Sequence, residues 1–244
     1  MRVLVTRPEP EALRLKAALE RRDIDVTVEP LLHVSFEDAD PIDLMDVQAL
    51  IATSRNGLRA LKLAGHLDAA RSLPVFTVGS GTAAEARALG FQVVVAGAGG
   101  ASALVPQIAS ALDPTAGLVL HLAGDRLAGD LRGELEQQGF RVLQPVVYHT
   151  VPATAFGEDT VEQLALGEIE GVLLMSPRTA VVYMDLVRKH GLRTAVRELI
   201  YYCLSQAVAD RLASLDASHI RVPDRPSLEE VLALVVSDAA QLDM

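Results

Sequence analysis

The sequence predicts an α/β protein in which helices cover parallel sheets and the chain forms two lobes. Three observations support this prediction. Short, fully apolar runs alternate with amphipathic helical stretches, residues recur at fixed offsets, and two extended segments follow prolines without leading directly into a helix. Apolar runs of this kind are typical of strands buried on both faces, as in parallel sheets.

The first strand and helix are expected at the start of the sequence. The run Val3-Leu4-Val5 precedes a helical stretch over 11–21, in which Leu15 and Leu19 lie four residues apart on one face. Six further apolar runs are each expected to form a strand that leads into a helix. They span residues 49–52, 75–78, 93–95, 118–120, 172–174 and 199–202. The helices expected after the first three of these span residues 56–63, 82–89 and 102–112.

An internal repeat indicates that the chain consists of two related halves. The residues that recur 116 positions later are Val3, Leu15 and Leu19, matched by Val119, Leu131 and Leu135. A second pair of segments consists of Ala52-Thr53-Ser54 and the similar Leu174-Met175-Ser176. Ser80 and Ser102 recur 125 positions later as Ser205 and Ser227. Because the matches keep their order and nearly their offset, duplication explains them better than chance.

Two extended segments are interpreted as crossings between the lobes. Residues 31–34 follow Pro30, and residues 146–150 follow Pro145. With crossings near 31–36 and 146–151, the first lobe would comprise residues 1–33 plus 151–244, and the second lobe residues 36–147. Two contiguous halves are the alternative.

Composition excludes several classes of protein. The 244 residues carry 22 basic and 32 acidic side chains, a net charge of −10. This charge argues against a general nucleic-acid binder, which needs a basic face to neutralise phosphates. A single cysteine argues against a disulfide scaffold or a Cys-rich metal site. The sequence has neither a signal-peptide pattern at its start nor an apolar run typical of a membrane span, so we expect a cytoplasmic protein with no membrane partner.

Several short motifs occur in order along almost the whole chain. They are Val3-Leu4-Val5-Thr6-Arg7-Pro8, Pro30-Leu31-Leu32, Thr53-Ser54, Val78-Gly79-Ser80-Gly81-Thr82-Ala83, Val147-Tyr148-His149-Thr150, Ser176-Pro177 and Arg225-Pro226-Ser227-Leu228-Glu229. Each motif is short, but in this order they resemble the uroporphyrinogen-III synthase family. The resemblance implies two Rossmann-like or flavodoxin-like lobes joined by a two-stranded linker, with the active site in the cleft between the lobes.

The resemblance also implies an activity. Such a lyase closes hydroxymethylbilane, a linear tetrapyrrole with two carboxylates on each ring, to uroporphyrinogen III. Water leaves from ring A, ring D is inverted, and the product feeds the synthesis of haem, sirohaem, chlorophyll or cobalamin. No cofactor or metal is implied. The expected partners are the substrate and hydroxymethylbilane synthase, which would hand the substrate over, and the protein is expected to be a monomer.

The acidic protein would have to bind this polyanion through local donors. Ligands of parallel sheets bind beyond the carboxyl ends of the strands, where helices begin with free N–H groups. The arginines expected there, each able to pair with a carboxylate, are Arg7, Arg55, Arg126 and Arg178. The hydroxyls expected to begin helices are those of Ser54, Thr82, Ser102, Ser176, Ser205 and Ser227; of these, Ser54, Thr82, Ser176 and Ser205 are the candidates for substrate binding. Alternatively, the arginines are solvated surface charges and the hydroxyls are simple N-caps.

Tyr148 is the catalytic candidate. Departure of the hydroxyl group needs a proton or hydrogen bond at the leaving oxygen, and a phenol supplies one without adding negative charge. In the family the matching tyrosine is implicated in this role. Alternatively, Tyr148 packs in the linker.

His33 and His149 could each donate a proton locally near neutral pH, but both are expected to be surface residues. Many members of the family have a Gly and a Thr within the segment that corresponds to residues 203–207, where Ser205 would substitute for the threonine. Cys203 is expected to be a buried thiol rather than a nucleophile.

Two other functions fit parts of the sequence. Residues 79–84 match the Gly-x-Gly-x-x-Ala pattern of dinucleotide-binding folds, but no acidic residue closes the next apolar run at 92–96, where a ribose partner is expected. A non-catalytic, two-lobed cytoplasmic binder of a polyanionic small molecule is the second alternative.

Overall fold

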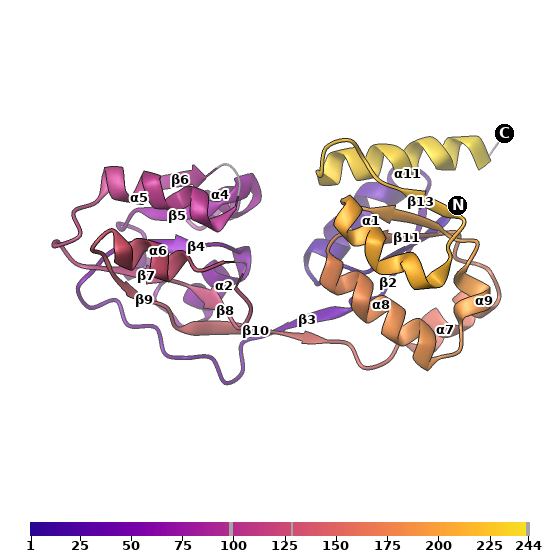
Figure 1. Ribbon diagram of the computed structural model, residues 1–244, viewed down its shortest axis with the longest axis horizontal. Helices are drawn as coiled ribbons and strands as arrows, with labels where there is room; N and C mark the ends of the chain where they lie inside the picture. Colours follow the sequence, from indigo (N-terminus) through magenta and orange to yellow (C-terminus); the bar gives the residue numbers. More distant parts are fainter. Residues whose placement is uncertain (98–99, 128, 243–244) are drawn as a thin grey trace. The chain divides into compact units, whose positions relative to one another are not determined.

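The computed structural model describes residues 1–97, 100–127 and 129–242 and divides into two compact units (Figure 1). The first unit comprises Met1–His33 and Val151–Met244, and the second comprises Val34–Thr150. In Figure 1 the first unit combines the indigo start of the chain with its orange and yellow end.

The first unit contains a five-stranded sheet in the order β13-β12-β11-β1-β2, in which all neighbours are parallel. Its strands are β1 (Arg2–Val5), β2 (Asp25–Val28), β11 (Gly171–Leu174), β12 (Ile200–Cys203) and β13 (His219–Arg221). Its helices are α1 (Glu11–Glu20), α7 (Glu158–Ala165), α8 (Pro177–Lys189), α9 (Arg193–Val196), α10 (Gln206–Ala209), the 3₁₀ helix η2 (Asp210–Leu215) and α11 (Leu228–Leu242).

Both faces of this sheet are buried, which explains why β11 has no polar alternation. Val172 and Leu174 point into the core formed with α7, α8, α9, α10 and η2. Leu173 points the opposite way, into the core formed with α1 and α11. Successive side chains of a strand face opposite sides, so a strand covered on both faces must be apolar throughout.

The second unit repeats this arrangement with a parallel sheet in the order β6-β5-β4-β7-β9. Its strands are β4 (Val47–Ala52), β5 (Val75–Val78), β6 (Val94–Gly97), β7 (Leu118–His121) and β9 (Arg141–Leu143). Its helices are α2 (Arg55–Leu63), α3 (Leu67–Ala70), α4 (Gly79–Ala88), the 3₁₀ helix η1 (Ala101–Leu104), α5 (Val105–Ala111) and α6 (Leu131–Gln137). One core involves α2, α3 and α4, and the opposite core involves η1, α5 and α6.

The two sheets correspond strand by strand, and the sequence repeat follows that correspondence. Val3 lies in β1 and Val119 in β7, which each stand fourth in the order of their sheet. Leu15 and Leu131 are buried residues of the helices that come next along the chain, α1 and α6. These recurring residues therefore lie in corresponding strands and helices of the two units.

A third sheet contains the segments that follow the two prolines, β3 (Leu32–Ser35) and β10 (Val146–Pro152). Its order is β3-β10-β8, where β8 (Ala123–Gly124) is a short strand that the sequence did not predict. As a result, the apolar run at 118–120 leads into β8, and α6 begins at Leu131 rather than directly after the run.

Candidate functional site

The candidate site residues of the second unit lie where its strands end. Ser54 and Arg55 follow β4, Thr82 lies in the first turn of α4 after β5, and Arg126 follows β8. All strands of this sheet are parallel, so β4, β5 and β7 end at the same edge of it. Tyr148 lies in β10, paired with Gly124 of β8.

Tyr148 is buried, and its phenol interacts with Ser54. The side chain is 8% exposed and packs with the core that includes α2. Burial raises the pKa of the Tyr148 phenol, a hydrogen bond with the Ser54 side chain acts in the opposite direction, and the negative charge of Asp125 raises the pKa further. The phenol is therefore protonated at neutral pH and able to donate a hydrogen bond.

The backbone around Tyr148 is fixed by Asp125. The Asp125 N–H donates to the Tyr148 carbonyl at 3.1 Å, and the Asp125 carboxylate accepts the Thr150 N–H at 3.0 Å. Arg126, whose side chain is 76% exposed, lies 3.7 Å from the same carboxylate. Such an exposed ion pair adds little stability, so Arg126 can turn towards a ligand at low cost.

Arg55 lies against the beginning of α4. Gly79 starts this helix with φ of +75°, which a glycine adopts without strain, and a Cβ added to Gly81 would collide with the Arg55 guanidinium. The position above Gly81, where a dinucleotide-binding fold would place a pyrophosphate, is thus beside a guanidinium. Thr82 is 7% exposed, and the helix begins three residues before it, earlier than the sequence indicated.

In the first unit, Ser176 is the N-cap of α8. Its Oγ accepts the Thr179 N–H at 3.1 Å and lies 2.8 Å from the Thr179 hydroxyl, so the simple capping role applies here. Ser205 precedes α10 but, in the part of the chain that the structure describes, makes no side-chain capping bond.

Arg7 and Arg178 follow neighbouring strands of the first unit. Arg7 comes after β1, and Arg178 is the second residue of α8, which follows β11. Because β1 and β11 pair in parallel, the two arginines belong to one edge of the sheet. Both side chains are partly buried.

His121 is a notable polar residue that the sequence analysis did not single out. It ends β7 and is 2% exposed. Its Nε2 lies 3.3 Å from the Thr53 hydroxyl, whereas Nδ1 has no hydrogen-bond partner among the described residues. Burial lowers the pKa of the imidazole to about 4, so His121 is neutral near pH 7. The signal in the sequence is a histidine directly after an apolar run, between two leucines.

The other titratable candidates are His33, His149 and Cys203. His33 is exposed, and His149 is partly exposed with Nε2 3.4 Å from the Asp38 carbonyl. Cys203 is fully buried, and burial raises the pKa of its thiol to about 12, which does not suit a nucleophile. Across residues 1–97, 100–127 and 129–242, no group of three or more His, Cys, Asp or Glu side chains is arranged to hold a metal ion. Within the same ranges no helix is long and apolar enough to cross a bilayer.

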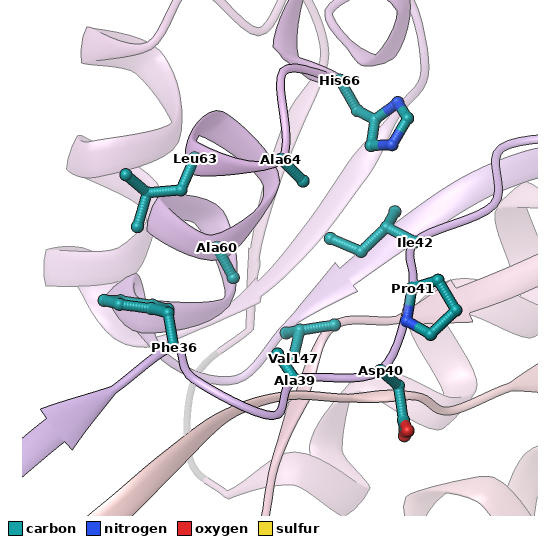
Figure 2. Close-up of a pocket in the computed structure, with 10 residues that line it drawn as sticks. All are labelled: Phe36, Ala39, Asp40, Pro41, Ile42, Ala60, Leu63, Ala64, His66 and Val147. Carbon is teal, nitrogen blue, oxygen red and sulfur yellow. The ribbon is translucent and has the colours of Figure 1, made fainter.

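Figure 2 shows a pocket of about 370 Å³ beside α2 in the second unit. It is lined by Phe36, Ala39, Asp40, Pro41, Ile42, Ala60, Leu63, Ala64, His66 and Val147. The lining is mostly apolar, and the Asp40 carboxylate accepts the Val146 N–H at 2.7 Å. This pocket lacks the cationic groups that a polycarboxylate requires and is not the candidate site.

Comparison with known proteins identifies the family. A family model described as uroporphyrinogen-III synthase HemD matches residues 14–233. The chain belongs to the uroporphyrinogen-III synthase family. A search of curated proteins gave no match.

Two solved structures of uroporphyrinogen-III synthases have a similar fold. The synthetase from Helicobacter pylori is 17% identical, with 97% of this chain and 99% of that chain covered and a TM-score of 0.64. A mutant synthase from the extremely thermophilic bacterium Thermus thermophilus is 18% identical, with 100% of this chain and 99% of that chain covered and a TM-score of 0.56. At these identities the likeness concerns the fold, and it confirms the predicted α/β class with parallel sheets.

Proposed function

We propose that this chain closes hydroxymethylbilane to uroporphyrinogen III, with loss of water and inversion of ring D. The observation that supports this proposal is the match of the uroporphyrinogen-III synthase family model to residues 14–233. The protein is accordingly a lyase of tetrapyrrole biosynthesis. A non-catalytic binder is not favoured by any feature of the site described above.

Arginines and helix starts at the strand ends would hold the carboxylates of the substrate. Arg7 and Arg178 follow adjacent strands of the first unit, and Arg55 and Arg126 lie at strand ends of the second. The net charge of −10 repels a polyanion at long range, so binding requires such close, directional donors. Thr82 and Ser205 would add hydroxyl donors at the starts of α4 and α10.

Tyr148 would act as the proton donor. The C–O bond of the hydroxymethyl group breaks, the leaving hydroxyl takes the Tyr148 proton, and water departs. Ring D then bonds through its substituted carbon, and rearrangement closes the macrocycle. The proton that the macrocycle loses on closure returns to the Tyr148 phenolate, so the residue is regenerated. A neutral, buried phenol suits this exchange because it remains protonated until the substrate is bound.

Besides proton donation, the protein would contribute to catalysis by orienting the substrate. Without an enzyme, hydroxymethylbilane closes in water to the isomer in which ring D is not inverted, as the biochemistry of the family implies. The protein must therefore hold the chain so that the substituted carbon of ring D attacks, and orientation alone can contribute at most about 7–11 kcal/mol. Contacts spread over several strand ends would provide it.

Isomer analysis tests this function. The purified protein is incubated with freshly prepared hydroxymethylbilane, and the products are oxidised and separated as porphyrins. We expect mainly the type III isomer with the protein and mainly type I in its absence. Type I alone in both samples would exclude the proposed activity.

A further inference from the structure

The ring of Tyr148 lies directly on the backbone of Gly124. The two residues are partners in the pairing of β10 with β8, at a point where the register shifts between Val146 and Tyr148. A Cβ added to Gly124 would lie 2.5 Å from Cζ of Tyr148, 2.6 Å from Cε2 and 2.8 Å from the hydroxyl oxygen. Only a residue without a side chain leaves the ring where it lies, so the position of the phenol depends on glycine at 124.

Burial raises the pKa of the Tyr148 phenol, and the Ser54 side chain is the hydrogen-bonding group that acts against this effect and lowers it. The position of the Ser54 hydroxyl is fixed by the backbone, since Ser54 Oγ accepts the Asn56 N–H at 3.2 Å as the N-cap of α2. A serine hydroxyl has one proton, and Asn56 supplies its own donor. The Ser54 proton therefore remains available for the Tyr148 oxygen, which leaves the Tyr148 proton for a second acceptor.

We propose that Gly124 and Ser54 are positioning residues for Tyr148: Gly124 seats the ring, and Ser54 donates to the phenol oxygen so that the phenol proton points towards the leaving group. This inference rests on the proposed function, in which Tyr148 is the proton donor. It changes the role expected for Ser54, whose hydroxyl acts on the tyrosine rather than on a substrate carboxylate. When Tyr148 has given up its proton, the Ser54 hydroxyl stabilises the phenolate until the proton returns.

The arrangement has a purely structural alternative. An aromatic ring over a glycine of the neighbouring strand also stabilises sheets that have no catalytic role. The test must therefore separate loss of folding from loss of a function that passes through Tyr148.

For Ser54, a double-mutant cycle with Tyr148 distinguishes loss of folding from loss of a function that depends on Tyr148. The quantity measured is the rate at which type III product forms. We expect Ser54→Ala to lower kcat at least about tenfold with KM nearly unchanged, and Ser54→Thr to restore most of it. In the Tyr148→Phe background Ser54→Ala should lower kcat no further. Asp130→Ala is the matched control, because Asp130 caps α6 by accepting the Gly133 N–H at 3.0 Å. Its effect should be small and equal in both backgrounds.

The same design applies to Gly124. Gly124→Ala should lower kcat at least about tenfold, and it should leave the residual kcat of Tyr148→Phe unchanged. Gly117→Ala is the matched control for crowding, since a Cβ there would lie 2.6 Å from the Asp46 carbonyl and 3.2 Å from Gln48 Cβ, at the start of β7. It should reduce the melting temperature without lowering kcat of the folded protein.

The proposal would be overturned if the reduction in kcat of a double variant equalled the product of the reductions in the two single variants. Ser54 or Gly124 would then act independently of Tyr148. A rise in KM with kcat unchanged in Ser54→Ala would overturn it as well, since that pattern indicates direct binding of substrate.

A measurement that needs no activity keeps this test separate from the proposed function. The chain has four tyrosines, and the ¹³Cζ resonance of Tyr148 can be assigned by its loss in Tyr148→Phe. We expect this resonance to shift at neutral pH in Ser54→Ala and to stay near its original position in Ser54→Thr and Asp130→Ala. No shift in Ser54→Ala would refute the hydrogen-bond role, whether or not the protein forms the type III isomer. If the NMR shift is present but the protein forms no type III isomer, Ser54 and Gly124 have no role in catalysis. Their contacts with Tyr148 are then purely structural.

Discussion

Burial fixes the protonation state of His121 at the end of β7. Its Nε2 faces the Thr53 hydroxyl, and its Nδ1 has no partner among the residues described. An unpartnered N–H is costly in a buried site, so the proton belongs on Nε2, which donates to Thr53. Thr53 directly precedes Ser54, and His121 thereby supports the turn from which Ser54 reaches Tyr148.

The lowered pKa of His121 predicts a dependence of stability on pH. The group has a pKa of about 4 when folded and 6.5 when unfolded, so the unfolded chain binds more protons in this interval. The stabilisation is complete above pH 6.5 and is lost as the pH falls towards 4, by on the order of 3 kcal/mol. Urea denaturation at a series of pH values measures the free energy of unfolding. As the pH falls, this free energy should decrease less steeply for His121→Leu than for the original protein. Identical profiles would contradict a buried, neutral His121.

The individual residues of the site could be predicted only in part. Arginines and hydroxyls at strand ends follow from the βα pattern, because parallel strands end at a common edge. Gly124 could not be predicted, because its role exists only where Tyr148 crosses it in another strand. Ser54 was identified as a helix start, but its contact with Tyr148 joins segments far apart in the chain.

Elements with apolar runs were predicted well, including the edge strand β6, whereas edge strands without such runs were missed. Residues 75–78 form β5, and residues 172–174 lie in β11, both inside sheets. The strands not predicted, β2, β8, β9 and β13, each lie at an edge of a sheet. An edge strand has a neighbour on one side only and tolerates polar residues such as Asp25 and Arg141, so it can lack the continuous apolar run.

The two candidate serines of the first unit should differ in their effect on helix stability. Ser176 makes a capping bond to the Thr179 N–H, whereas Ser205 makes none within the described residues. We expect Ser176→Ala to lower the free energy of unfolding by about 1 kcal/mol and Ser205→Ala to lower it by less than about 0.5 kcal/mol. Chemical denaturation of the two variants measures the difference. Equal losses would show that the cap bond of Ser176 contributes nothing.

At the scale of the whole molecule, the overall charge opposes the binding of a polycarboxylate that individual arginines favour. If Arg7 and Arg178 bind carboxylates, replacing both by alanine should raise the Kd for uroporphyrinogen III about tenfold at low salt, with a smaller increase at high salt because ions screen the pairs. Calorimetric titration under anaerobic conditions measures this.

The double replacement Arg188→Ala and Arg193→Ala is the matched control for Arg7 and Arg178. It removes the same charge, with Arg188 in the last turn of α8, the opposite end from Arg178. We expect its Kd to stay close to that of the original protein. If both double variants bind equally well, the arginines at the strand ends are ordinary surface charges.

The unit formed by residues 34–150 should fold by itself. Its sheet, its two cores and the residues Tyr148, Gly124 and Ser54 all come from one continuous segment. A fragment of these residues should show a cooperative thermal transition and native-like circular dichroism. A non-cooperative melt would mean that the second unit depends on the rest of the chain.

The origin of the first unit from both ends of the chain has a consequence for synthesis on the ribosome. Strands β1 and β2 emerge before residues 34–150, yet the sheet neighbour of β1 on its other side, β11, begins at Gly171. The 34–150 unit is translated in between and is complete before that neighbour exists. The nascent N-terminal segment must therefore stay unassembled and protected from aggregation while a whole unit is made.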